Sequence, residues 1–235
     1  MKTLLLAVAL LLALGSWVPA HAEAVGFTEA QVKSNFIGDF QKWLARDGEM
    51  AKDKDAILCI GSSSLRLWQT IQEDLAPAKV IHCGFGGSTI GDVLLFKEFF
   101  RRYEARTILL YEGDNDLESG NFTPESFVAK TKEFCAAVWT RRPDTKFCLL
   151  SVKPSPARAK SLPRQQAANK LLQEFAAGNR NVIYVDLATP MLGRNGAPRP
   201  ELFAKDRLHL NPAGYALWTR VVRAALKLDE SPAPP

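Results

Sequence analysis

Five short apolar runs recur along the chain, separated by longer segments in which apolar residues return every three or four positions. The runs cover residues 56–60, 79–83, 107–111, 146–152 and 182–187. They are rich in β-branched and large apolar residues and do not alternate strictly with polar ones, as expected of strands covered on both faces. The pattern predicts five buried, parallel strands.

The segments between the runs have helical spacing. Their apolar stripes are Leu95, Phe96, Phe99, Phe100 and Tyr103; Phe127, Phe134 and Val138; Leu171, Leu172 and Phe175; and Trp218, Val221, Val222 and Ala225. Asn211 as the N-cap and Pro212 at the first position predict the start of the last helix. A further helix is expected over residues 28–46. This alternation predicts a three-layer α/β/α domain with a five-stranded parallel sheet.

The first 22 residues have the layout of a secretory signal peptide. Lys2 precedes an apolar run over residues 4–14, and Ala20-His21-Ala22 forms an A-x-A cleavage site. An uncleaved anchor is the alternative, although the run is short for a membrane span. We therefore expect a secreted or periplasmic protein that begins near Glu23 or Ala24 and keeps no stable membrane span.

The remaining chain fits one domain, residues 23–228, followed by a frayed tail at 229–235. The formal net charge is +5, and loss of the single charge of Lys2 lowers it to +4. This small excess is spread along the chain without a basic run, so no nucleic-acid partner is indicated.

The four cysteines are expected to be free, buried thiols. Cys59, Cys83 and Cys148 lie in the apolar runs, where cysteine serves as a small hydrophobic residue, and Cys135 lies in a helical segment. An even number in a secreted chain also permits disulfides. No C-x-x-C pair is present, so a zinc site is not supported.

Polar and glycine-rich segments follow four of the five predicted strands. They are 61–64 (GSSS), 84–88 (GFGGS), 112–116 (EGDND) and 206–210 (DRLHL). Function in parallel α/β sheets gathers beyond the carboxyl ends of the strands, so these segments are expected to form one site. The long connection 188–210 also favours a functional loop.

Two histidines remain after signal cleavage, and they have different contexts. His82 lies within an apolar run and is expected to be a structural residue. His209 follows Asp206 by three residues in a predicted turn, which can bring the carboxylate to one ring nitrogen and leave the other free. Such a pair can act as a general base beside a serine. Taken alone, the D-x-x-H pattern favours a surface turn, and it gains weight only with a nucleophile and an oxyanion site elsewhere.

Together the four segments resemble the blocks of the SGNH, or GDSL-type, serine hydrolase family. The matching stretches are GSSSLRLW (61–68), GFGGST (84–89), GDND (113–116) and DRLHLNPAGY (206–215), in the order of the family. The resemblance covers about residues 55–226. It implies the flavodoxin-like SGNH hydrolase fold.

The resemblance implies that Ser63 is the nucleophile, with Ser62 at the variable position after the glycine and Ser64 as a turn or capping residue. Trp68 matches an aromatic often found five residues after the nucleophile. Ser62 stands where the name-giving motif has aspartate, and His82 where many relatives have asparagine. These departures suggest a subgroup whose substrate cannot be inferred from better-known members.

The resemblance also assigns the remaining functional residues. The oxyanion hole would consist of the backbone N–H groups of Ser63 and Gly87 and the side-chain amide of Asn115. His209 would be the general base, oriented by Asp206. Preorganised donors of this kind stabilise the charge that develops on the carbonyl oxygen.

Other interpretations of these segments fit less well. The GFGGS stretch lacks the lysine of a phosphate-binding P-loop. Residues 112–120 do not match a calcium loop, because the required glycine is displaced from Ser119 to Gly120. Asp116 is expected to steady its loop, and Asp114 to be solvated.

Residues 151–160 contain Lys153 and Arg158 and are expected to form a loop near the site. Both side chains are interpreted as solvated loop charges. The alternative is that one of them contacts an anionic substrate.

The resemblance therefore implies a secreted serine esterase or acyl hydrolase that needs no metal or cofactor. Its substrate would be a small-molecule or carbohydrate ester, with short-chain or acetylated-carbohydrate esters favoured. An acyltransferase using the same residues, or a non-catalytic carbohydrate-binding relative, remains an alternative. The biological ester and the oligomeric state stay open.

Overall fold

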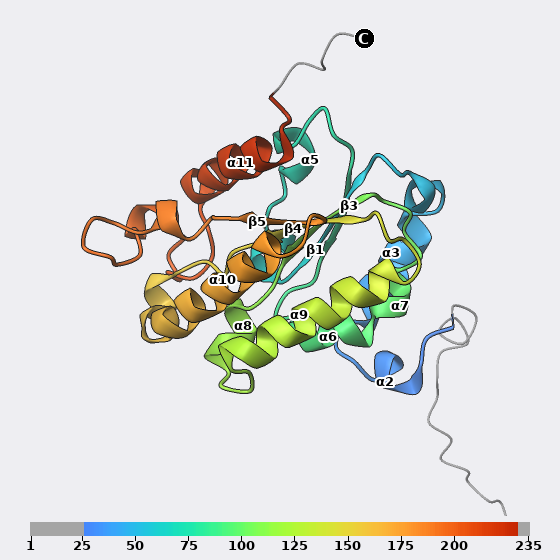
Figure 1. Ribbon diagram of the computed structural model, residues 1–235, viewed down its shortest axis with the longest axis horizontal. Coiled ribbons are helices and arrows are strands. Elements are labelled where there is room, and N and C mark those ends of the chain that lie inside the picture. The colour runs from blue at the N-terminus through green and yellow to red at the C-terminus, as the bar shows by residue number, and fades with distance from the viewer. Residues whose placement is uncertain (1–25, 230–235) are drawn as a thin grey trace, which may run out of the picture.

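The computed structural model describes residues 26–229, in which a parallel sheet lies between two layers of helices (Figure 1). The predicted signal peptide and residues 230–235 of the predicted tail lie outside this range. No helix within 26–229 combines the length and apolar character that a membrane span requires.

The five predicted strands are present and all pair in parallel. They are β1 (Ile57–Gly61), β2 (Val80–Gly84), β3 (Thr107–Tyr111), β4 (Lys146–Leu150) and β5 (Val182–Val185). Their order in the sheet is β2-β1-β3-β4-β5, which is the flavodoxin-like arrangement. The register places Gly61 opposite both Gly84 and Tyr111, so β1, β2 and β3 end at the same level.

Successive side chains of each strand enter opposite layers of the core. Leu58 and Ile60 of β1 belong to one apolar cluster, while Ile57 and Cys59 belong to the other. The first cluster is covered by α3 (Ile37–Arg46), α6 (Ile90–Leu95), α7 (Lys97–Phe100), α9 (Pro124–Trp139) and α10 (Leu162–Ala177). The short helix α2 (Glu29–Val32) is joined to the end of α6 by the hydrogen bond from the Gln31 amide to the Leu95 carbonyl. The second cluster is covered by α4 (Ser63–Arg66), α5 (Ile71–Asp74) and α11 (Pro212–Leu226). Because both faces of the sheet are buried, the sequences of the strands are continuous apolar runs.

The prediction of a single helix over residues 28–46 was wrong, because the helix is interrupted between α2 and α3. The Ser34 hydroxyl donates to the Gln31 carbonyl at 2.8 Å and accepts from the Phe36 N–H at 3.3 Å. Local bonds of this kind compete with the helical backbone pattern. The break turns α3, so that Phe40 enters the core completely.

The stripe from Leu95 to Tyr103 is also interrupted, with Phe96 lying between α6 and α7. The Phe96 ring stacks on Phe40 with ring centroids 3.6 Å apart, whereas Leu95 is 37% exposed and lies outside the core. Packing against α3 therefore decides the path of the chain here.

The expectation of free, buried cysteines is confirmed. Cys59, Cys83, Cys135 and Cys148 are all buried and unpaired. Burial raises the pKa of the Cys83 and Cys148 thiols to about 12, so both are protonated and behave as apolar side chains.

The long connection after β5 is folded back on itself before it reaches α11. Two isolated antiparallel bridges, Leu192 with Pro198 and Phe203 with Leu210, hold it together. The Asn211 side chain accepts from the Gly214 N–H, as predicted for an N-cap, and its amide donates to the Phe203 carbonyl at 3.0 Å. The first turn of α11 therefore fixes the end of the connection.

Close packing at Gly214 generates a test of this arrangement. A Cβ atom at this position would lie 2.3 Å from the Leu202 carbonyl oxygen, so G214A should push α11 away from residues 202–210. We expect G214A to lower the free energy of unfolding by about 1–3 kcal/mol, as overpacking does. Urea unfolding followed by circular dichroism measures the change.

Gly178 provides the control, because a Cβ atom there would meet its nearest atom at 3.7 Å, an ordinary contact. G178A should change the free energy of unfolding by less than about 1 kcal/mol. Equal stability of G214A and the parent would contradict the close approach of α11 to this loop.

Candidate active site

Ser63 begins α4 directly beyond the carboxyl end of β1. The Ser62 N–H donates to the Tyr111 carbonyl at 3.1 Å, which continues the β1–β3 ladder by one residue, and the Ser62 carbonyl then accepts from the Arg66 N–H. The chain turns from strand to helix at this residue. Ser62 is almost completely buried, so Ser63 is the serine that this turn presents to the site.

His82 contributes to the position of α4. Its Nε2 lies 2.8 Å from the Leu65 carbonyl oxygen, and burial lowers the pKa of the ring. This contact is the structural role expected for His82, since it joins the middle of β2 to the helix that carries Ser63.

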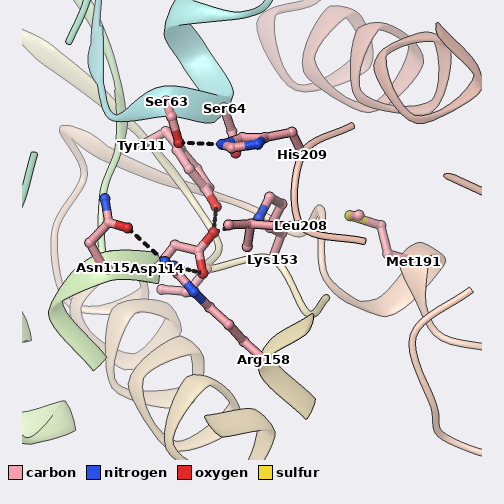
Figure 2. Close-up of polar contacts among 12 residues, drawn as sticks. Ser63, Ser64, Tyr111, Asp114, Asn115, Lys153, Arg158, Met191, Leu208 and His209 are labelled. Atoms are coloured by element: carbon pink, nitrogen blue, oxygen red, sulfur yellow. Dashed lines mark hydrogen bonds and ion pairs between the residues drawn. The ribbon is translucent and has the colours of Figure 1, made fainter. Parts of the chain in front are cut away.

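The connection after β5 brings His209 to Ser63. The Nε2 atom of His209 lies 3.0 Å from Ser63 Oγ, and Nδ1 lies 2.6 Å from Asp206 Oδ2 (Figure 2 shows the contact with Ser63). The other Asp206 oxygen accepts the N–H groups of Leu208 and His209, both at 3.0 Å. One carboxylate therefore fixes both the turn and the ring, with the second ring nitrogen directed at Ser63.

The Asp206 carboxylate stays ionised in this environment. Bonds from the Leu208 N–H and the His209 ring lower its pKa to about 2. A permanent negative charge beside Nδ1 selects the tautomer with the proton on Nδ1 and leaves Nε2 free to accept a proton.

The three groups predicted as oxyanion donors are the N–H groups of Ser63 and Gly87 and the Asn115 amide. Within residues 26–229, the backbone N–H groups of Ser63 and Gly87 make no hydrogen bond. Gly87 has φ +88°, a conformation that side chains other than glycine rarely adopt. The Asn115 amide, in the first turn of α8 (Asp114–Glu118), donates to the Ser88 carbonyl at 2.9 Å. These are the donors that the sequence predicts for an oxyanion hole.

Asp116 ties the loop after β2 to the loop after β3. Its two carboxylate oxygens accept the Ile90 N–H at 2.8 Å and the Gly113 N–H at 3.0 Å. The expectation that Asp116 steadies its loop is confirmed. Burial raises its pKa to about 6.

Glu112 is a buried carboxyl group that the sequence analysis did not single out. It accepts a hydrogen bond from Ser88 Oγ at 2.7 Å, beneath the loop that carries Gly87. Burial raises the pKa of Glu112 well above its ordinary value, which favours the neutral acid. Its position directly after β3, where site residues are expected, was the feature of the sequence that could have identified it.

The interpretation of Asp114, Lys153 and Arg158 as solvated charges was wrong. Lys153 is fully buried and pairs with one Asp114 oxygen, while Arg158 pairs with the other at 2.7 Å. Lys153 lies just beyond the carboxyl end of β4. Polar segments in this position after the other strands were predicted to form the site, and the same reasoning would have included Lys153. Burial alone would raise the pKa of Asp114, but the charges and hydrogen bonds of Lys153 and Arg158 outweigh it and lower the pKa.

Among the residues predicted for the site, the structure brings Ser63, His209 and Asp206 into contact, and it brings Asn115 to the carbonyl of Ser88, the neighbour of Gly87 in the chain. Within the described part of the chain, no group of three or more His, Cys, Asp or Glu side chains is arranged to hold a metal ion. The arrangement can activate a hydroxyl group and stabilise an adjacent oxyanion.

Comparisons with solved structures agree on the fold. A Streptococcus pneumonia protein whose description names platelet activating factor matches at a TM-score of 0.68 and 20% identity, covering 87% of this chain and 99% of its own. A GDSL-like lipase from Bacteroides thetaiotaomicron matches at 0.67 and 19%, covering 81% and 98%. The family 3 carbohydrate esterase of Clostridium thermocellum matches at 0.59 and 16%, covering 73% and 94%.

Among curated proteins, no significant match was found. The model of the GDSL-like lipase/acylhydrolase family, in contrast, matches residues 57–217, from β1 to the middle of α11. This chain therefore belongs to the GDSL-like lipase/acylhydrolase family and is an ester hydrolase.

Proposed function

We propose that this hydrolase is a serine esterase in which Ser63 is the nucleophile, His209 the general base and Asp206 the residue that orients it. The observation that carries the proposal is the 3.0 Å contact between His209 Nε2 and Ser63 Oγ. A nucleophile and a base within hydrogen-bond reach, with a third group orienting the base, are the signature of covalent acyl transfer.

In the first half of the reaction, His209 Nε2 accepts the proton of Ser63 Oγ as the oxygen attacks the ester carbonyl carbon. Negative charge moves to the carbonyl oxygen, to which the Ser63 and Gly87 N–H groups and the Asn115 amide would donate hydrogen bonds. Asp206 stabilises the imidazolium that forms. When the C–O bond breaks, His209 gives its proton to the leaving alcohol.

In the second half, water replaces the alcohol. His209 accepts a proton from water as the oxygen attacks the acyl-enzyme carbonyl, and the same three donors hold the second oxyanion. Collapse releases the carboxylic acid and returns the proton to Ser63 Oγ. Every proton is carried by His209, so the cycle needs no cofactor.

We propose short-chain or acetylated-carbohydrate esters as substrates. Solved structures with the same fold include an acetyl esterase and family 3 carbohydrate esterases. Among residues 26–229, the exposed large apolar side chains are Met50, Leu95 and Ile183, none of which belongs to the segments that form the site. A long acyl chain would therefore find little exposed apolar surface there.

Transfer of the acyl group to another alcohol would use the same residues. The non-catalytic carbohydrate-binding alternative has less support, because a binding protein has no physical need for a histidine held 3.0 Å from a serine hydroxyl.

We also propose that the enzyme acts outside the cytoplasm, on the basis of the signal-peptide pattern in residues 1–22. N-terminal sequencing of the protein recovered from the periplasm or medium of a bacterial host should begin at Glu23 or Ala24. A protein that stays in the cytoplasm with Met1 intact would contradict export.

The nucleophile can be identified by comparing the three neighbouring serines. We expect S63A to lower the hydrolysis of p-nitrophenyl acetate by at least about a thousandfold, because no other group would form the acyl-enzyme. S62A and S64A should keep most of the activity. Release of p-nitrophenol measures the rate, and acetate yield in the presence of an acceptor alcohol separates hydrolysis from transfer.

Full activity in S63A would overturn the proposed nucleophile. A transferase would instead show S63A-sensitive release of p-nitrophenol with the acetyl group on the acceptor alcohol. The melting temperature of each variant shows whether it is folded.

The pH dependence follows from the environment of Asp206. Because the pKa of Asp206 is lowered to about 2, Asp206 should stay charged as the pH falls from 7 to 4 and should add no step to the acid limb of kcat/KM in that range. D206N should keep the fold and lower kcat between about tenfold and a thousandfold, less than for a buried triad carboxylate because water can partly replace it. Unchanged kcat in D206N would contradict this role.

A further inference from the structure

A group of three charged side chains lies buried against the oxyanion hole. Lys153 is 0% exposed, Asp114 5% and Arg158 16%. Burying charges costs free energy unless each is paired, and here a single carboxylate pairs with two cations. The cluster has a net charge of +1 beside the site where negative charge would develop.

The Arg158 guanidinium joins this cluster to Asn115. Nη1 donates to Asp114 Oδ1 at 2.7 Å, and Nη2 donates to Asn115 Oδ1 at 3.0 Å. Figure 2 shows Arg158 reaching these two residues from the side opposite to Ser63 and His209. The planar fork of arginine matches two oxygens on adjacent residues, which a lysine ammonium cannot do with the same geometry.

These contacts fix which end of the Asn115 amide faces the reacting atoms. The oxygen is held by a cation, and the Nδ2 group donates one hydrogen to the Ser88 carbonyl at 2.9 Å. A flipped amide would place its NH₂ group against the guanidinium and its oxygen against the Ser88 carbonyl. Both contacts would be repulsive, so only one orientation is stable.

The Arg158 contact also strengthens the amide as a donor. A hydrogen bond from a charged group is stronger than one between neutral groups, and it withdraws electron density from the amide oxygen toward the guanidinium. The second Nδ2 hydrogen thereby becomes a better donor to an oxyanion.

We propose that Arg158, held in place by the Lys153–Asp114 pair, is a positioning residue that orients and polarises the Asn115 amide for oxyanion stabilisation. The inference rests on the proposed function, since it assigns Asn115 the third donor position. Arg158 acts only through Asn115 and does not contact the ester.

A double-mutant cycle on p-nitrophenyl acetate hydrolysis tests this coupling. N115A should lower kcat on the order of a hundredfold, as expected for the loss of one oxyanion donor. R158A should lower kcat between about ten- and a hundredfold through misplacement of the amide, with KM nearly unchanged. In the N115A background, R158A should cost less than about twofold, because the group through which it acts is already missing.

R158K separates charge from geometry. It keeps the positive charge beside Asp114 but cannot bind Asp114 and Asn115 together, so its kcat should lie closer to that of R158A than to that of the parent.

Arg101 gives a matched control. It is 19% exposed and its fork also joins a carboxylate, Glu98, to a neutral oxygen, Thr140 Oγ1, but at the end of α7. R101A should leave kcat within about twofold of the parent. Its change in melting temperature should be similar to that of R158A.

Three results would overturn the inference. They are unchanged kcat in R158A when N115A is impaired, losses in N115A and R158A that multiply in the double variant, and a loss in R158A that resides in KM, which would mean that Arg158 contacts substrate. Each of these outcomes leaves the role of Ser63 intact. The proposed function itself fails only if S63A stays active.

Discussion

The site depends on one constraint: β1 pairs in parallel with both β2 and β3, and the three strands end at the same level. Gly61 is paired with Gly84 on one side and with Tyr111 on the other, so the segments that follow these strands leave the sheet at one level. A Cβ atom at Gly61 would lie 2.4 Å from the Tyr111 carbonyl oxygen, so this pairing leaves no room for a side chain. Ser63, Gly87 and Asn115 follow strands that end together, so all three lie beyond the same edge of the sheet.

Buried acids hold the loops beyond the strands, in addition to the apolar packing of residues such as Phe85. Asp116 accepts two backbone N–H groups from different loops, and Glu112 binds the Ser88 hydroxyl. Asp114 binds both cations of the buried cluster. Such networks are directional, so they determine the orientation of Asn115 and Gly87 more sharply than apolar contacts would. The three carboxyl groups all come from the short segment 112–116, which therefore organises the side of the site that holds Asn115.

His209 depends on a different part of the fold. It reaches Ser63 on a folded connection that is braced by α11 through Asn211 and the close contact at Gly214. Asp206 is 49% exposed and makes its bonds within the same turn, so His209 and Asp206 form a local unit. This unit packs against Ser63 from outside the sheet. Asn115, in contrast, belongs to the segment that directly follows β3.

The sequence by itself determined the five strands, the order of the polar segments and the local units. The apolar runs, the Asn211-Pro212 helix start and the Asp206–His209 turn depend on neighbouring residues, so spacing alone predicted them. Only the tertiary structure decided the break between α2 and α3, the placement of Leu95 outside the core and the burial of Lys153, Asp114 and Arg158. A charged side chain is assigned to solvent unless a partner offsets its desolvation, and here the partners lie about forty residues apart in the chain. Pairing across that separation is set by strand order, which no local pattern in the sequence contains.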